Sequence, residues 1–260
     1  MIPNSWHTYD QYGYALVAIV GTFAAVALIQ WVIQHSRWAD WARTLHGVAP
    51  PFINIIGVLF GLTLAFLAND TWSAHDRAMQ AVYKEADALQ TIHTLSSKLP
   101  YTLQAQTHDA LQSYARASAD EWPQLARRHQ SREVRQRADA LMRLLSSDEM
   151  AKAAGSNVQS LMLAKASELR DERNQRIGLS QTHVNPLKWL GMAFLGLLTL
   201  MSVAVVHVDN PRAAFVAIML FALAAAPTAA IVLIQGNPFQ EPTAVTAAPI
   251  ERAILEMAPR

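Results

Sequence analysis

Two polar side chains stand inside an otherwise apolar stretch, residues 52–68. Asn54 carries an amide and Thr63 a hydroxyl, and both groups can replace part of an ion's hydration shell in a membrane pore. Their spacing puts them on nearly opposite sides of a helix, so they cannot both line one straight path. The neighbouring apolar residues suit a constriction that closes by excluding water: Ile55, Leu59, Leu62 and Phe66. The stretch therefore predicts a pore-lining helix.

Small residues form a stripe on the same stretch at helical spacing. Gly57, Gly61 and Ala65 recur every four residues, and small residues let membrane helices approach closely. Tight helix packing is the simpler reading of this stripe, and a pore or a central symmetric contact is the alternative.

Other residue patterns give no sign of catalysis. The chain has no cysteine, and its nine histidines show no HxxxH or HExxH pairing, so we expect no metal site. No phosphate-binding loop, dinucleotide glycine motif, GxSxG or triad spacing occurs. We expect no cofactor and no enzyme. The apolar stretches also lack ionisable residues at their centres, which argues against a proton-driven carrier.

One segment is rich in arginine. Residues 127–143 carry six arginines against two acids. An ordinary solvated helix face explains them, and contact with anionic headgroups is the alternative. The six are Arg127, Arg128, Arg132, Arg135, Arg137 and Arg143.

Four apolar stretches must position these residues. They cover residues 14–33, 52–68, 187–208 and 213–234, and each is about as long as the roughly 20 helical residues that cross a bilayer. The whole chain is 52% apolar and only 16% charged. The composition predicts an all-α integral membrane protein with four transmembrane helices, and the net charge of +1 gives no reason to expect nucleic-acid binding.

The charged residues concentrate between the second and third stretches. Residues 70–186 hold 15 of the 21 Lys and Arg and 14 of the 20 acids. Apolar residues recur there at helical spacing, with breaks at Pro100, Trp122-Pro123 and Gly155. We expect about four helices in an extramembrane insert, with a small extra one near 148–154. The predicted division is 1–69 for spans one and two, 70–186 for the insert, 187–234 for a hairpin of spans three and four, and 235–260 for a tail with a short helix.

The second span leads into the insert without an obvious break. Helix-compatible sequence runs from the span to about Lys98, which predicts one continuous rod. The alternative is a break at Asn69-Asp70, with Asp70 or Ser73 capping a new helix.

An even number of spans places both termini and the insert on one side of the membrane. The Lys and Arg residues near span ends favour a cytoplasmic position for that side. The first span disagrees, because its basic residues, Arg37 and Arg43, both follow it.

Several segments resemble the bacterial bestrophin-like family. The matching motifs are Glu85-Ala86-Asp87-Ala88-Leu89, then Leu99-Pro100, then Asn237-Pro238-Phe239. Family members often carry acidic residues just before the last motif, where this chain has Gln235 and Gly236. The resemblance implies kinship with bestrophins, which are pentameric anion channels whose second span lines the pore.

Two functions follow as expectations. The first is a homo-oligomeric channel for small anions in a bacterial inner membrane, with a pentamer implied by the resemblance. The second is a non-conducting scaffold or sensor whose helical insert binds a ligand or partner and signals through span two.

Overall fold

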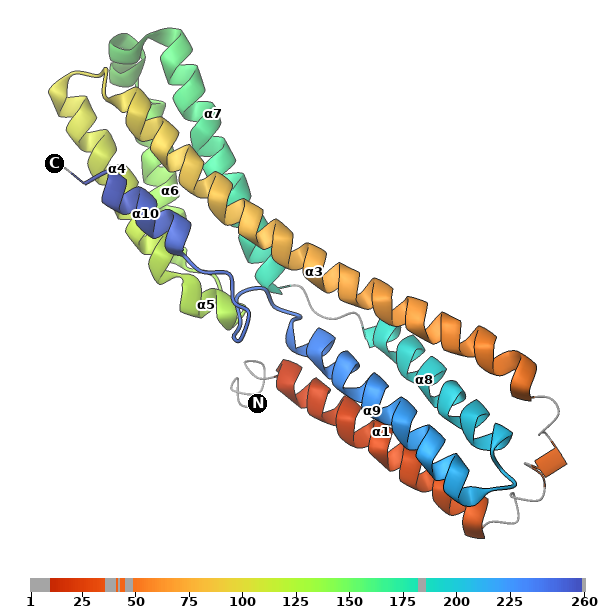
Figure 1. Ribbon diagram of the computed structural model, residues 1–260. Helices are drawn as coiled ribbons and strands as arrows, with labels where there is room; N and C mark the ends of the chain where they lie inside the picture. Colours follow the sequence, from red (N-terminus) through yellow and green to blue (C-terminus); the bar gives the residue numbers. More distant parts are fainter. Residues whose placement is uncertain (1–9, 36–40, 42, 45–48, 182–185, 259–260) are drawn as a thin grey trace. The chain divides into compact units, whose positions relative to one another are not determined.

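The computed structural model describes residues 10–35, 41, 43–44, 49–181 and 186–258. Every regular element in these residues is a helix (Figure 1). The chain divides into two compact units. Unit 1 comprises Met1–Trp72 and His183–Gly236, and unit 2 comprises Ser73–Thr182 and Asn237–Arg260.

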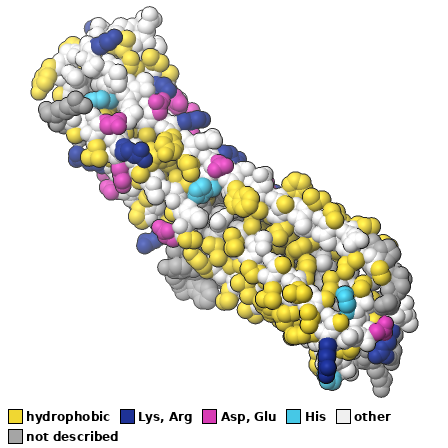
Figure 2. Space-filling view, in the orientation of Figure 1, with side chains coloured by type: hydrophobic (Ala, Val, Ile, Leu, Met, Phe, Trp, Pro, Cys, Tyr) yellow, Lys and Arg dark blue, Asp and Glu magenta, His cyan; other side chains and the backbone are white. Residues whose placement is uncertain are grey.

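Unit 1 contains the four apolar helices that the sequence predicts. They are α1 (Asp10–His35), the first half of α3 (Ala49–Ser96), α8 (Pro186–Val206) and α9 (Pro211–Ile234). Each is long and apolar enough to cross a membrane, so the all-α fold with four candidate spans is confirmed. Hydrophobic side chains cover much of the visible surface of this unit (Figure 2), as expected where the surrounding solvent is lipid.

The turn between α8 and α9 is fixed by a cap. Asn210 is the N-cap of α9, and its side chain accepts a hydrogen bond from the Ala213 amide at 3.2 Å. Pro211 follows at the first helical position, where a missing amide hydrogen costs little. Gln30 of α1 donates to the Pro211 carbonyl at 3.0 Å. The last of these bonds joins α1 to the start of α9.

α3 is one helix from Ala49 to Ser96, so the predicted continuity past residue 69 is confirmed. Asp70 does not cap a new helix, because it lies inside α3 and pairs with Lys188 of α8 at 2.6 Å. α3 ends before Leu99-Pro100, as the sequence predicts, and α4 begins at Tyr101.

Unit 2 is built from the second half of α3 and from α4 (Tyr101–Asp120), α5 (Trp122–Ala126), α6 (Arg132–Leu145), α7 (Asp148–Gln181) and α10 (Ala248–Glu256). α6 shows why these helices associate, because its apolar stripe of Val134, Ala138, Leu141 and Leu145 is buried in the common core. The predicted break at Gly155 is a kink inside α7, where this glycine has a φ of 75°.

The segment after α9 packs into the core of unit 2. Phe239, Val245, Ile250 and Met257 are all buried there. This docking could not be anticipated from a tail that contains only one short helix.

Candidate functional site

The membrane half of α3 has one packed face. Phe60, Leu67 and Ala68 are buried against α8 and α9, and the Phe60 ring lies 5.3 Å from that of Phe221. Gly196 of α8 allows this approach, because a Cβ added there would lie 3.2 Å from Phe60.

The opposite face of the same segment is exposed in the single chain. We call it the exposed α3 face, and it consists of Asn54, Ile55, Leu59, Leu62 and Phe66. The exposed fraction is 57% for Ile55 and 68% for Phe66. Five of the six residues that the sequence proposed for a pore therefore share one side of α3.

Thr63 is the exception. It is half-buried, and its hydroxyl donates to the Leu59 carbonyl at 2.8 Å. The predicted opposition of Asn54 and Thr63 around the helix fits this difference in exposure.

The small-residue stripe has no close neighbour within one chain. Among the described residues, nothing lies within 4 Å of a Cβ added at Gly57 or Gly61, and Ala65 is exposed. The predicted packing role of Gly57, Gly61 and Ala65 stays a prediction about contacts beyond a single chain.

Glu85 of the family motif lies in a buried polar cluster of unit 2. Its Oε1 accepts hydrogen bonds from the Tyr114 hydroxyl at 2.8 Å, from the Ser118 hydroxyl at 2.7 Å and from Arg176 Nη2 at 3.2 Å. Its Oε2 lies 3.1 Å from Arg176 Nε. Glu85, Tyr114, Ser118 and Arg176 are all fully buried, so this carboxylate joins α3, α4 and α7 from the inside.

A second carboxylate extends the cluster. Glu121 accepts from Arg173 Nη2 at 2.6 Å and from Arg173 Nε at 3.1 Å, and it lies 3.4 Å from Arg176. It also accepts from the Ser131 amide at 2.7 Å, directly before α6. The buried charge cluster thus contains two carboxylates and two guanidinium groups, which balance one another. Its members are Glu85, Tyr114, Ser118, Glu121, Arg173 and Arg176.

The cluster also affects the titration of Tyr114. Burial raises the pKa of its hydroxyl well above the usual value, and the negative charge of Glu85 raises it further. Tyr114 therefore stays protonated and keeps donating its hydrogen bond to Glu85.

The C-terminal family motif, Asn237-Pro238-Phe239, is buried beside this cluster. The Asn237 side chain donates to the carbonyls of Leu125 and Ala126, both at 3.3 Å, and accepts from the Phe239 amide at 3.0 Å. It thereby satisfies two of the carbonyls that end α5. Pro238 is buried between these two residues of the chain.

Trp122 connects the motif to the cluster. Its ring meets Phe239 edge-on with centroids 5.9 Å apart, and Cζ of Arg176 lies 4.4 Å from the Trp122 ring centroid. Its indole donates to the Val245 carbonyl at 2.7 Å. Two of the three motifs that carry the family resemblance, those of Glu85 and Asn237, therefore converge on one buried site.

Sequence analysis missed most of the cluster, although a signal was present. The apolar stripe of α7 runs through Met162, Ala166 and Leu169, and Arg173 and Arg176 continue it at the same helical spacing. A charged residue on a buried stripe indicates a buried partner of opposite charge.

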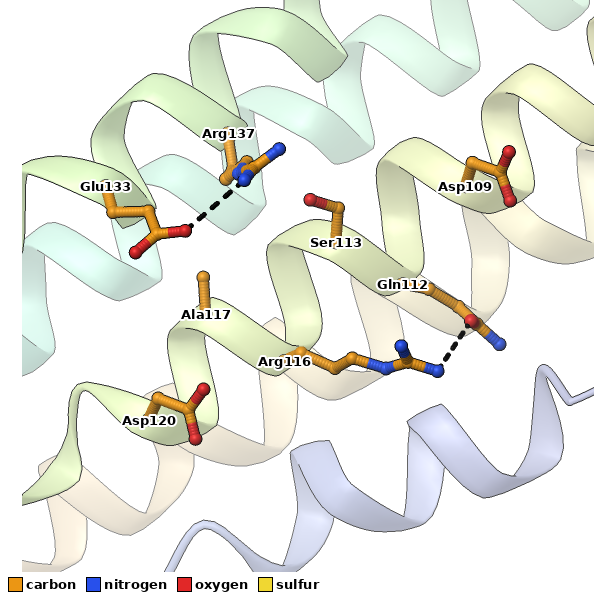
Figure 3. Close-up of a pocket in the computed structure, with 8 residues that line it drawn as sticks. All are labelled: Asp109, Gln112, Ser113, Arg116, Ala117, Asp120, Glu133 and Arg137. Atoms are coloured by element: carbon orange, nitrogen blue, oxygen red, sulfur yellow. Dashed lines mark hydrogen bonds and ion pairs between the residues drawn. The ribbon is translucent and has the colours of Figure 1, made fainter.

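A surface groove of about 380 Å³ lies between α4 and α6 (Figure 3). Three of its charged groups make contacts within their own helices: Arg116 donates to Gln112 at 3.0 Å, and Arg137 pairs with Glu133 at 3.3 Å. Asp109 and Asp120 also line it. Among the described residues, no group of three or more His, Cys, Asp or Glu is arranged to hold a metal ion.

Known proteins share this architecture. A family model described as the Bestrophin-like domain matches residues 20–250. A substituted bacterial Bestrophin homolog from Klebsiella pneumoniae superposes with a TM-score of 0.71 at 16% identity, covering 94% of this chain and 97% of that chain. The same homolog solved by Zn-SAD phasing gives a TM-score of 0.64 at 15% identity, covering 94% and 96%.

A further similar structure is a substituted variant described as a membrane protein. It gives a TM-score of 0.61 at 17% identity and covers 97% of this chain and 98% of that chain. No curated protein sequence matches. Because the family model reaches from α1 into α10, the chain belongs to the Bestrophin-like family.

Proposed function

We propose that this chain is one subunit of a homo-oligomeric membrane channel for small anions, with the exposed α3 face lining the pore. The observation that carries the proposal is the asymmetry of α3 within unit 1. One face packs on α8 and α9, whereas the opposite face exposes large apolar side chains and the Asn54 amide. An amide on a lipid-facing surface would leave its donors unpaired, whereas water in a lumen would satisfy them.

The chemistry of this face suits a weakly selective pore. The Asn54 amide offers hydrogen-bond donors to an anion that has lost part of its water. Leu59, Leu62 and Phe66 form an apolar surface that closes a narrow pore by dewetting. No ionisable side chain lies among the residues of this face, so an ion is not trapped on its way through.

Family membership supports the proposal. The resemblance implies the pentameric arrangement of bestrophins, in which the second span lines the pore, and α3 is the second span here. We place the protein in the inner membrane of a bacterium, with unit 2 and both termini in the cytoplasm, as the basic residues near the span ends favour.

A symmetry-resolved image of the detergent-solubilised oligomer tests this proposal before any assay is chosen. A closed ring with α3 nearest the axis is the expected result. A monomer, or a ring with α3 at its lipid-facing edge, would overturn the pore.

Flux through reconstituted vesicles then tests individual residues. We expect Leu59→Ala to raise anion conductance and Asn54→Leu to lower it, because the first widens the neck and the second removes its amide donors. Leu190→Ala is the matched control, because Leu190 is a 69% exposed leucine of α8 outside the exposed α3 face. Unchanged conductance in both α3 variants would remove α3 from the pore.

A second candidate function is a non-conducting sensor or scaffold. The observation that favours it is that one helix, α3, contains both the membrane-spanning segment and Glu85 of the buried charge cluster. A movement of the cluster in unit 2 can therefore be transmitted along α3 to its membrane-spanning segment. A two-fold dimer without conductance would select this function.

A further inference from the structure

Two contacts mark the end of the membrane-spanning segments in unit 1. Asp70 of α3 pairs with Lys188 of α8 at 2.6 Å, and Trp72 donates to Gln235 at 3.0 Å, directly after α9. Charged residues and tryptophan are typical of the interface between hydrocarbon and headgroups. Gln235 therefore lies at the membrane boundary.

The chain then enters unit 2 almost at once. Asn237 is two residues beyond Gln235, and two residues span at most about 7 Å. Asn237 donates to the carbonyls of Leu125 and Ala126, and Gln240 donates to the same Ala126 carbonyl at 2.6 Å. Three hydrogen bonds thus tie the end of α5 to the chain where it leaves the membrane.

Arginines follow this tether directly. Arg127 and Arg128 come next in the chain, and Arg132 and Arg135 lie in the first turn of α6. We define the arginine patch as Arg127, Arg132 and Arg135, because all three are exposed. None of them forms an ion pair with any residue of the described part of the chain.

The acids around the patch are committed elsewhere. Glu121 is buried against Arg173, Glu133 pairs with Arg137, and Asp139 lies 3.9 Å from Arg170. Glu241, which follows Gln240, also interacts with another group. It is therefore left unchanged in the variants below.

We propose that the arginine patch binds the anionic phospholipid headgroups of the same membrane that unit 1 spans. The headgroup layer on each side of a bilayer is about 5–7 Å thick, and the chain from Gln235 to Asn237 is no longer than that, so its connectivity allows the patch to reach this layer. Unpaired arginines at that position bind lipid phosphates by charge-assisted hydrogen bonds. The interaction goes beyond conduction, because it fixes unit 2 against the bilayer whatever passes through the pore.

The cysteine-free chain allows a direct test in the full protein. Gln130→Cys puts one thiol between Arg127 and Arg132, and Ser146→Cys puts one at the far end of α6. Each is labelled with bimane, reconstituted in nanodiscs, and quenched with a headgroup-spin-labelled lipid. We expect at least about twofold stronger quenching at residue 130 in phosphatidylglycerol than in phosphatidylcholine, with no such difference at residue 146.

The triple variant R127Q/R132Q/R135Q tests the role of charge. It should fold, since these side chains are exposed and unpaired, and circular dichroism checks this. We expect its residue-130 quenching in phosphatidylglycerol to fall to the phosphatidylcholine level. Arg143→Gln is the matched control, because it lies on the same exposed face of α6, about 16 Å further along the axis. It should leave the quenching unchanged.

A thermal-shift titration in detergent separates lipid from other anions. The phosphatidylglycerol concentration that gives half the maximal rise in Tm should increase about fivefold for each arginine removed. An equal rise with inorganic phosphate would overturn the proposal in favour of a soluble-anion site. A changed oligomer size in the triple variant would overturn it in favour of a subunit contact, and equal quenching in both lipids would overturn it outright.

Discussion

Arg176 is completely buried, and its charge is balanced by the carboxylates of Glu85 and Glu121. Its Nη1 has no hydrogen-bond partner among the described residues, and the Trp122 ring covers the guanidinium instead. A buried pair contributes little net stability compared with apolar packing, but breaking one partner is costly because the other charge stays buried. The cluster therefore makes the arrangement of α3, α4 and α7 specific.

Glu85→Gln tests this directly. The glutamine side chain is nearly the same size as that of glutamate, and its carbonyl oxygen can still accept the hydrogen bond from Tyr114. The substitution removes the negative charge closest to Arg176. We expect a loss of about 3 kcal/mol in the free energy of unfolding, measured by denaturant titration in detergent with circular dichroism. Arg137→Gln is the control, since the pair with Glu133 is half-exposed and should contribute less than about 1 kcal/mol. Equal losses in the two variants would contradict the argument.

His93 predicts a pH dependence of stability in unit 2. Burial lowers the pKa of His93, and the adjacent His108 lowers it further; the two rings lie 5.7 Å apart. His108 in turn bonds the Met257 carbonyl and lies 3.9 Å from Asp109. The folded state thus binds a proton at His93 less readily than the unfolded state does.

The contribution of neutral His93 to the free energy of unfolding should therefore be complete above the usual histidine pKa of about 6.5. It should decrease as the pH falls below that value. Unfolding midpoints measured between pH 7.5 and pH 5 check this. His93→Gln should flatten that part of the profile, whereas His129→Gln, at an exposed position, should not. A profile that His93→Gln leaves unchanged would assign the dependence to other groups.

At the scale of the elements, α8 shows how one helix can hold two different glycines. Gly196 faces Phe60, which a Cβ would meet at 3.2 Å, whereas nothing lies within 4 Å of a Cβ at Gly191. The first glycine is a packing requirement of α3, and the second is not required by any described contact within the chain.

Valine at each position separates the two roles. Gly196→Val forces Phe60 away from α8 and should lower stability by about 1–3 kcal/mol, seen as a lower Tm in detergent. Gly191→Val adds the same side chain to the same helix without that clash, so it should change Tm much less. An equal decrease in Tm for both variants would contradict the packing argument. It would show that valine destabilises α8 itself, whatever it contacts.

The helices were predictable because each is set by local pattern. The α3 rod follows from an unbroken helical sequence past Asn69, and the α7 kink follows from Gly155. The partners of Glu85 were not predictable, because Arg176 meets it only after three helices have packed. The docking of Phe239 was likewise invisible, since Asn237 reads locally as a turn residue while its amide caps a helix more than a hundred residues earlier.

At the scale of the whole molecule, four spans fix a pattern of sides. The second half of α3 and the segment after α9 both belong to unit 2. The chain therefore crosses the membrane an even number of times between them, through α8 and α9. The short connection at Asp209 and Asn210 between α8 and α9 must then lie on the opposite side from unit 2. This relation holds whether the protein conducts ions or only senses a ligand.

Single cysteines in the cysteine-free chain report these sides. Asn157→Cys lies at an exposed position of unit 2, and Asp209→Cys lies at the exposed turn between α8 and α9. With a membrane-impermeant maleimide, we expect intact spheroplasts to label residue 209 at once and residue 157 only after the membrane is opened, because the basic residues near the span ends favour a cytoplasmic unit 2. The reverse pattern would keep four spans and invert the orientation. The four-span arrangement places one crossing, α8, between the two residues. Labelling of both residues from one side would require an even number of crossings between them, and the four-span arrangement would then be wrong.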